Sequence, residues 1–147
     1  MKPVCLVLGA GAGIGGTVAA KFAQEGYHSS LCRRSDKEGL DRLVKNIEDQ
    51  GGSANGYIMN AIEDNAIEEV ITSIESDIGP IEVLVYNLGA QTGMKLLDQT
   101  SHKEFEWGWR MASFGLFRAA KVLCPLMLER GKGTFLVTSA TAAMRGN

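Results

Sequence analysis

The 147-residue sequence has little net charge, few cysteines and few prolines, and these shortages exclude several classes of protein. Fifteen basic and 17 acidic residues give a net charge of −2, so we expect neither nucleic acid nor an anionic membrane as a partner. Three cysteines without a Cys-x-x-Cys pair predict no disulfide framework and no metal site, and they favour a reducing, cytoplasmic compartment. Glycines interrupt the first apolar run after Leu8, too early for a signal peptide, and no stretch approaches membrane-spanning length.

Glycine, by contrast, is in excess, with 18 copies against three prolines. Apolar residues make up 45% of the chain and are spread along its length, which excludes disorder. The length suffices for one domain with a buried core and is too short for two. We therefore expect a single domain over residues 1–147, and the glycines become the feature to explain.

Five short apolar runs alternate with segments of helical periodicity. The expected strands are Val4–Leu8, Tyr27–Cys32, Ala54–Met59, Ile81–Tyr86 and Thr134–Thr138. A run that is apolar throughout is typical of a strand covered on both faces. Strands that alternate with helices, joined by connections long enough for crossovers, predict an α/β fold. It would be a Rossmann-type, doubly wound parallel sheet with helices on both faces.

Four helices are expected between these strands, over residues 14–25, 36–50, 67–78 and 102–130. Two of them are preceded by a pair that fits the capping-box pattern, in which a hydroxyl and a carboxylate three residues later bind each other's backbone N–H. These pairs are Ser35 with Glu38 and Ser101 with Glu104. The last helix has aromatic residues on more than one face, which predicts a partner helix, with ordinary core packing as the alternative.

The segment between the first strand and the first helix holds a cluster of glycines: Gly9, Gly11, Gly13, Gly15 and Gly16. Unpaired N–H groups at a helix start favour a phosphate, and glycine lets the backbone approach it closely. The spacing fits Gly-x-Gly-x-x-Gly, Gly-x-x-x-Gly-x-Gly and the Gly-x-Gly-x-Gly pattern of methyltransferases. The loop alone therefore indicates a nucleotide-like ligand, and a tight turn without a ligand remains an alternative.

The end of the second strand narrows these interpretations. NAD sites and methyltransferase sites usually place a carboxylate about 20 residues after the glycines, where it holds the ribose hydroxyls. Arg33 and Arg34 occupy that position here. Guanidinium groups can hold the 2′-phosphate of NADP by bidentate hydrogen bonds. The alternative is that the two arginines lie in a surface turn and are simply solvated. We predict NADP rather than NAD, and a methyltransferase-like enzyme is disfavoured.

Four segments in the same order resemble the short-chain dehydrogenase/reductase family. They are the pattern Gly9-x-x-x-Gly13-Ile14-Gly15, the sequence Val-Leu-Val-Tyr-Asn-Leu-Gly-Ala over 83–90, the helix from Gly115-x-Phe117 to 127, and residues 133–146. The resemblance covers the whole chain. It implies an oxidoreductase that transfers hydride between NADP(H) and a small alcohol or carbonyl substrate. It also implies a homodimer or homotetramer that forms through the long helix over 102–130.

The resemblance also implies which residues contact the cofactor. The glycine loop would bind the pyrophosphate, and Asn60 stands where the family usually has an aspartate that binds the adenine amino group. The Asn60 carbonyl can still accept that hydrogen bond. Asn87 and the residues after it would line the adenine–ribose edge, and Asn87 could also tie two strand ends together. The full set of expected cofactor contacts is Gly9, Gly11, Gly13, Ile14, Gly15, Arg33, Arg34, Asn60, Ala61, Asn87, Gly89 and Ala90.

The catalytic residues that the resemblance implies are altered or absent. No tyrosine is followed by lysine at the fourth position, so the family's Tyr-x-x-x-Lys pair is missing from these 147 residues. The family's serine position falls on Ala140 and its helix asparagine on Ala112. Ser139 is the candidate catalytic hydroxyl, but neighbouring strand residues point to opposite faces, so it is no automatic substitute. Thr138 and Thr141 are further candidates.

Two functional hypotheses follow for this chain. The first is an oxidoreductase of which the chain is the N-terminal, cofactor-binding portion, truncated after the fifth strand and inactive alone. The second is a non-catalytic module that binds NADP or regulates a partner, which alanines at positions 112 and 140 would permit.

Overall fold

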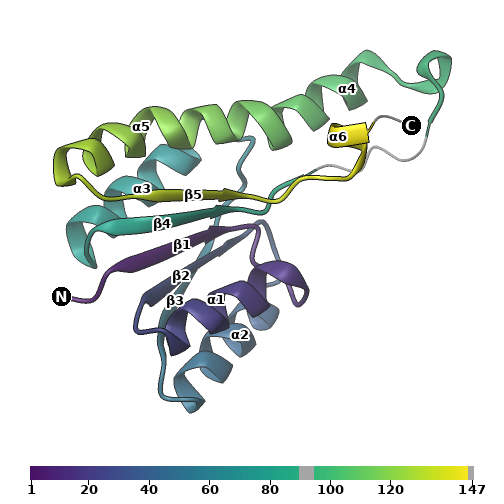
Figure 1. The fold of residues 1–147 in the computed structure, drawn as a ribbon. Helices are drawn as coiled ribbons and strands as arrows, with labels where there is room; N and C mark the ends of the chain where they lie inside the picture. The colour runs from purple at the N-terminus through teal and green to yellow at the C-terminus, as the bar shows by residue number, and fades with distance from the viewer. Residues whose placement is uncertain (90–94, 146–147) are drawn as a thin grey trace.

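The computed structural model describes residues 1–89 and 95–145, and its strands form one parallel sheet. The strands are β1 (Val4–Leu8), β2 (His28–Arg33), β3 (Ser53–Ile58), β4 (Ile81–Tyr86) and β5 (Thr134–Val137). Their order across the sheet is β3-β2-β1-β4-β5 (Figure 1). Because the strand order reverses at β1, the predicted doubly wound, Rossmann-type fold is confirmed.

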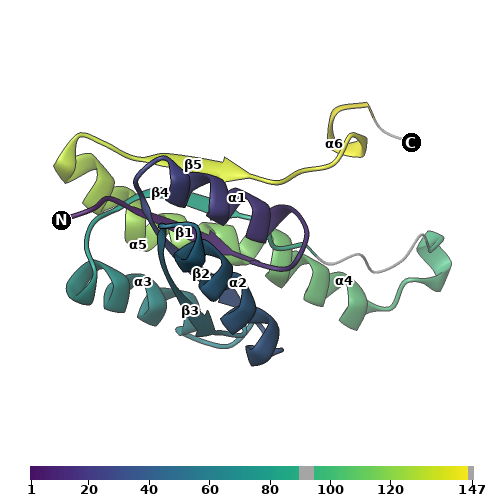
Figure 2. The ribbon, with the colours of Figure 1, turned by 90° about the horizontal axis from the view of Figure 1, so that it is seen from below.

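Helices cover both faces of this sheet. α1 (Ile14–Gln24) and α2 (Lys37–Asp49) lie on one face, whereas α3 (Ala66–Asp77) and α5 (Gly115–Arg130) lie on the other (Figures 1 and 2). The remaining short helices are η1 (Leu97–Gln99), α4 (His102–Trp109), η2 (Arg110–Phe114) and α6 (Ala142–Arg145). Right-handed crossovers require this change of face where the strand order reverses.

Strand β1 is buried on both sides, which explains why it is apolar throughout. Val4, Leu6 and Leu8 pack with the buried side chains of α3 and α5. Cys5 and Val7 point the other way and pack under α1 and α2. Desolvation raises the pKa of the Cys5 thiol to about 12, so this cysteine behaves as a small apolar side chain.

The predicted start of α2 is wrong, although the strand bounds agree with the sequence to within a residue. Ser35 and Glu38 form no capping box. Asp36 caps the helix instead, because its side chain accepts a hydrogen bond from the Gly39 N–H at 2.9 Å. Asp36 has φ +60°, a left-handed conformation that aspartate tolerates better than most residues. The second predicted capping box, at Ser101 and Glu104, is confirmed.

Helices α4, η2 and α5 form one continuous helix of 29 residues, His102–Arg130. The expectation that no stretch approaches membrane-spanning length is wrong, because an 18-residue window of this helix has a mean hydropathy of 1.4. By length and composition it could cross a membrane. In the fold, however, Ala119, Leu123 and Met127 are buried in the same core as α3 and β4. Packing within the domain therefore accounts for part of its apolar composition, since 33% of that window is buried.

Candidate nucleotide-binding site

The glycine loop lies where the carboxyl ends of β1, β2 and β4 meet. The N–H groups of Gly9 and Ala10 donate to the Cys32 carbonyl of β2 at 3.0 and 2.8 Å. Gly9 has φ +93°, and a Cβ there would lie 2.5 Å from the carbonyl oxygen of Asn87 after β4. Only glycine fits this position, because the loop passes between two neighbouring strand ends. This crevice at a reversal of strand order is where open α/β sheets bind ligands.

The glycines of the loop differ in what surrounds them. A Cβ at Gly15 would collide with the Gly9 carbonyl oxygen, and one at Gly16 would collide with that of Gly11. These two glycines let α1 pack tightly against the loop. A Cβ at Gly11 or Gly13 would have no protein atom within 4 Å. The fold itself does not require glycine at these two positions, so their bare backbone leaves room for a ligand.

The start of α1 has the properties of a phosphate site. Gly13 is the N-cap residue and supplies no side-chain hydrogen bond, and the first turn contains no acidic residue. Ile14, the first residue of α1, is 61% exposed. The Gly16 N–H already donates to the Gly11 carbonyl at 2.9 Å, whereas the N–H groups before it and the helix dipole together favour an anion. The predicted loop residues are thus brought together around one open helix start.

At the end of β2, Arg33 and Arg34 differ in their surroundings. The Arg33 guanidinium lies 3.2 Å from the Asp36 carboxylate and is 24% exposed, while Arg34 is exposed. The sequence analysis missed Asp36 as an acid at this site. The sequence feature that could have identified Asp36 is an acidic residue three positions after Arg33, at the turn into α2. The site therefore holds two guanidinium groups, one already paired and one open to solvent.

At the end of β3, Asn60 and Ala61 begin the segment that leads into α3. The Asn60 side chain donates to the Glu63 carboxylate at 3.1 Å and accepts weakly from the Ile62 N–H at 3.4 Å. Ala61 is buried, and its carbonyl accepts a hydrogen bond from Arg118 of α5 at 3.0 Å. The sequence analysis did not single out Arg118, whose signal is a charged residue within the apolar part of the long helix.

Asn87 ties three strand ends together. Its amide donates to the Gly9 carbonyl at 2.9 Å, and its side-chain oxygen accepts from the Thr138 hydroxyl at 2.7 Å. Its backbone N–H binds the Leu8 carbonyl. These bonds fix the orientation of the side-chain amide, so Asn87 has a structural role in linking the strand ends. Gly89 is exposed with free space around its Cβ position, and Ala90 lies outside the described residues.

The candidate hydroxyls that follow β5 lie beside a cavity of about 420 Å³ between the end of β5 and the long helix. Ser139 and Thr138 line it, together with Gly89, Ala112 and Ala140. The two positions at which the family would place serine and asparagine therefore contribute methyl groups to the same cavity. Among the described residues, no group of three or more side chains is arranged to bind a metal.

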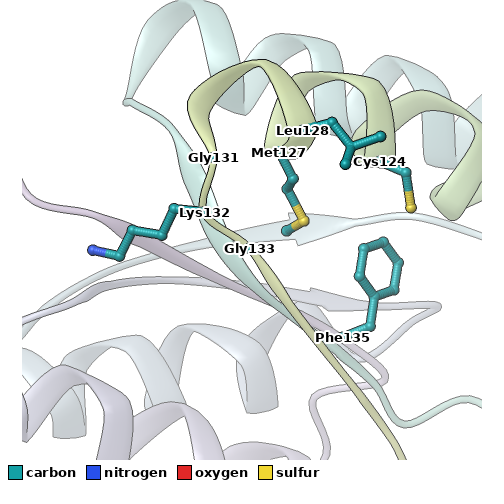
Figure 3. Close-up of a pocket in the computed structure, with 7 residues that line it drawn as sticks. All are labelled: Cys124, Met127, Leu128, Gly131, Lys132, Gly133 and Phe135. Carbon is teal, nitrogen blue, oxygen red and sulfur yellow. The ribbon is translucent and has the colours of Figure 1, made fainter.

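A second cavity of similar volume lies at the opposite end of β5 (Figure 3). It is lined by Met127 and Leu128 of α5 and by Phe135 of β5, with Gly131 and Lys132 in the turn between them. This cavity adjoins the beginning of β5, whereas the glycine loop and Asn87 meet the opposite, carboxyl end of the sheet. It is therefore separate from the candidate nucleotide site.

A parallel sheet with a glycine loop and an open helix start at its reversal point defines a dinucleotide-binding α/β protein. The sequence model for the short chain dehydrogenase family matches residues 3–147, and the chain belongs to this family. The membership confirms the resemblance seen in the sequence and argues against a methyltransferase-like enzyme.

Relatives and solved structures extend this likeness. The chain is 31% identical over 144 residues to a 3-oxoacyl-[acyl-carrier-protein] reductase of Thermotoga maritima, which aligns 98% of this chain with 58% of that protein. It is 28% identical to a 2,3-dihydro-2,3-dihydroxybenzoate dehydrogenase of Bacillus subtilis, over 95% of this chain and 53% of that protein. The chain thus spans little more than half the length of these curated relatives.

Two solved structures show the same fold with different cofactors. Actinorhodin polyketide ketoreductase with NADPH has a TM-score of 0.90 at 28% identity, covering 99% of this chain and 56% of that one. NAD⁺-bound xylitol dehydrogenase has a TM-score of 0.89 at 26% identity, covering 99% and 55%. Neighbours of this chain thus bind either nicotinamide cofactor.

Proposed function

We propose that this chain supplies the NADP(H)-binding part of an oxidoreductase that transfers hydride between the cofactor and a small alcohol or carbonyl substrate. The observation that carries the proposal is the free space beside Gly11 and Gly13, where a Cβ would meet no protein atom within 4 Å, next to the start of α1, which has no side-chain cap. The relatives named as reductases and the NADPH in the ketoreductase structure support the same chemistry.

Each part of the cofactor has a proposed partner in this chain. The N–H groups at the start of α1 would bind the pyrophosphate. Arg34, with Arg33, would hold the 2′-phosphate, because a guanidinium matches the geometry of a phosphate. Asn60 would accept a hydrogen bond from the adenine amino group, and Gly89 would lie along the adenine–ribose edge. When bound, the cofactor supplies the hydride.

The cavity at the end of β5 is the proposed place for the substrate. Of the residues that line it, Ser139 and Thr138 carry hydroxyl groups. Thr138 already donates to Asn87, so the Ser139 hydroxyl is the better candidate for a hydrogen bond to the substrate oxygen. The chain has no Tyr-x-x-x-Lys pair, and we propose that it turns over no substrate by itself.

A second candidate function is a non-catalytic module that binds NADP. The methyl groups of Ala112 and Ala140 in the cavity favour it, because an alanine can neither hold nor move a proton. Both candidates share the cofactor site and differ only in whether hydride transfer follows binding.

A further proposal concerns a second copy of the chain along the long helix. Trp109 and Phe114 stack with ring centroids 5.0 Å apart, and Phe117 follows at 6.4 Å from Phe114. Trp109 and Phe117 are 48% and 60% exposed. An exposed aromatic row of this kind is typical of a protein interface.

Calorimetric titration with NADPH and NADH tests the proposed cofactor. We expect NADPH to bind more tightly and neither reduced cofactor to be consumed in the presence of carbonyl compounds. Arg34→Asp should reverse the preference, because a carboxylate repels the 2′-phosphate and can hold the ribose hydroxyls of NAD. Equal affinity for the two cofactors in the unaltered protein would remove the arginines from the proposal.

A further inference from the structure

Arg118 on α5 is a buried cation with only 8% of its surface exposed. Its Nε and Nη2 groups donate to the two carboxylate oxygens of Glu68 at 2.8 and 2.6 Å. Its Nη1 group donates to the Ala61 carbonyl and its Nη2 group to the Glu63 carbonyl, each at 3.0 Å. Such complete pairing offsets the cost of burying a charge, and it uses every nitrogen of the guanidinium.

These contacts converge on the segment between β3 and α3, which carries Asn60. Local bonds also hold this segment: the Glu63 N–H donates to the Asn60 carbonyl at 3.0 Å, and the side chains of Asn60 and Glu63 pair at the surface. Asn65 enters α3 with φ +61° and no side-chain cap. The charged hydrogen bonds come from Arg118, 50 or more positions further along the chain, so the long helix contributes directly to the position of the segment.

We propose that Arg118 is a positioning residue for the adenine end of the cofactor site. It donates to the carbonyls of Ala61 and Glu63 and to the carboxylate of Glu68, and Asn60 is carried on the segment that these bonds hold. The inference rests on the proposed function, since it concerns where that cofactor's adenine binds. The same helix lines the substrate cavity through Ala112, so one rigid element fixes both ends of the site.

The geometry of the side chain makes the role specific to arginine. A planar fork with five N–H donors can bind a carboxylate bidentately and two carbonyls at once, whereas lysine offers one compact ammonium group. Arg118→Lys therefore keeps the charge beside Glu68 but leaves at least one buried carbonyl without a donor. A segment that loses a hydrogen bond of this kind is held less firmly, and the site that it carries then binds its ligand less tightly.

Arg130 provides a matched control on the same helix. Its guanidinium also pairs with a carboxylate of α3, that of Glu75 at 2.6 Å, and it also donates to a carbonyl, that of Ile81 at 3.1 Å. These contacts lie at the beginning of β4, whereas Asn60 follows the end of β3. Arg130→Lys should thus cost comparable stability without touching the adenine end.

The experiment measures binding of 2′,5′-ADP, the adenosine half of NADP, by calorimetry, and amide hydrogen exchange over residues 60–66. We expect Arg118→Lys to lower the affinity for 2′,5′-ADP about tenfold, which corresponds to the loss of one charged hydrogen bond. Arg130→Lys should leave this affinity within about twofold of that of the unaltered protein. Exchange over 60–66 should accelerate in Arg118→Lys and stay unchanged in Arg130→Lys.

Unchanged binding and exchange in Arg118→Lys, or equal losses in both variants, would overturn the positioning role. If the unaltered protein does not bind 2′,5′-ADP at all, the proposed function fails. The exchange rates then still decide separately whether Arg118 holds the segment.

Discussion

The carboxylate of Asp36 lies 3.2 Å from the Arg33 guanidinium while it also caps α2 through the Gly39 N–H. The ion pair occupies one of the two arginines that would hold a 2′-phosphate. A phosphate at this site would have to share Arg33 with an existing anion or displace it. Arg34 has no such competitor among the described contacts and is the more available of the two.

Asp36→Asn is therefore expected to strengthen NADPH binding. Asparagine caps a helix as well as aspartate does, so α2 should keep its start while Arg33 loses its anionic partner. A partly exposed ion pair is worth up to about 1 kcal/mol, so the gain should reach about fivefold, with NADH affinity unchanged. Calorimetry with both cofactors measures it.

Asp41→Asn is the control for this prediction, because it removes an equal charge from the same helix at a residue paired with Lys37 at 2.9 Å. If both variants strengthen NADPH binding alike, the effect comes from net charge and not from release of Arg33.

Two glycine substitutions should separate the fold from the site. Gly15→Ala places a methyl group against the Gly9 carbonyl oxygen and should destabilise the protein by about 1–3 kcal/mol. Gly11→Ala meets no protein atom within 4 Å and should leave the unfolding free energy within about 0.5 kcal/mol. Its NADPH affinity should nevertheless fall, because the methyl group occupies the space left for the pyrophosphate. Urea unfolding and calorimetry test both. A Gly11→Ala protein of normal stability and normal affinity would contradict the proposed site.

The pairing of Glu68 with Arg118 should appear in the pH dependence of stability. The hydrogen bond from Arg118 lowers the pKa of the Glu68 carboxyl below its ordinary 4.5. A lowered folded-state pKa means that the unfolded chain binds more protons at acid pH. The stabilisation is therefore present in full above about pH 4.5 and is lost as the pH falls through the lowered value.

Urea unfolding of the unaltered protein and of Glu68→Gln, from pH 7 down to pH 3, measures this loss. The difference between the two should be largest near neutral pH and shrink as the solution becomes acidic. Glu129→Gln, which removes an exposed carboxylate from α5, is the control for the loss of one negative charge. A difference that is constant with pH would show that the Glu68 charge contributes nothing to stability.

Association through the long helix is tested by sedimentation. If the aromatic row binds a second copy, Trp109→Glu and Phe117→Glu should convert an oligomer into a monomer, because a charge cannot be buried unpaired in an interface. Leu128→Glu, at an 80% exposed position near the end of α5, is the control and should leave the oligomer intact. A monomer at all concentrations in the unaltered protein would contradict the proposal.

The sequence predicted the sheet closely because glycines or turns bound each strand, and because β1 and β4 are apolar enough to identify. It mistook the start of α2, since Ser35 and Glu38 match the capping-box pattern as well as Asp36 matches a simple cap. The choice depends on the left-handed φ of Asp36, which contacts with Arg33 and Gly39, three residues away on either side, stabilise. The capping-box pattern alone does not show which of the two residues caps the helix.

The glycine loop between β1 and α1 could be predicted from its local sequence, whereas the residues that hold its surroundings could not. Gly9 to Gly15 follow a spacing that short-range chemistry imposes. Arg118 acts on residues 50 or more positions away, and nothing in the neighbourhood of Arg118 indicates which carbonyls it will bind. The role of Asn87 in tying strand ends together was predicted, but its bond to Thr138 could be seen only in the folded structure.

The π-helical segment η2 contains the Met111 carbonyl that accepts the Tyr86 hydroxyl, and it has a geometric effect on the surface. Residues five apart in an α-helix point about 140° away from each other, so they cannot stack. Trp109 and Phe114 are five apart and stack nearly parallel, at 13°, because the wider turn brings the sixth residue back over the first. The same irregular turn therefore binds a buried tyrosine of the sheet on its inner side and aligns a row of aromatic rings on its outer side. Removing a single residue from that turn would rotate the rings out of line.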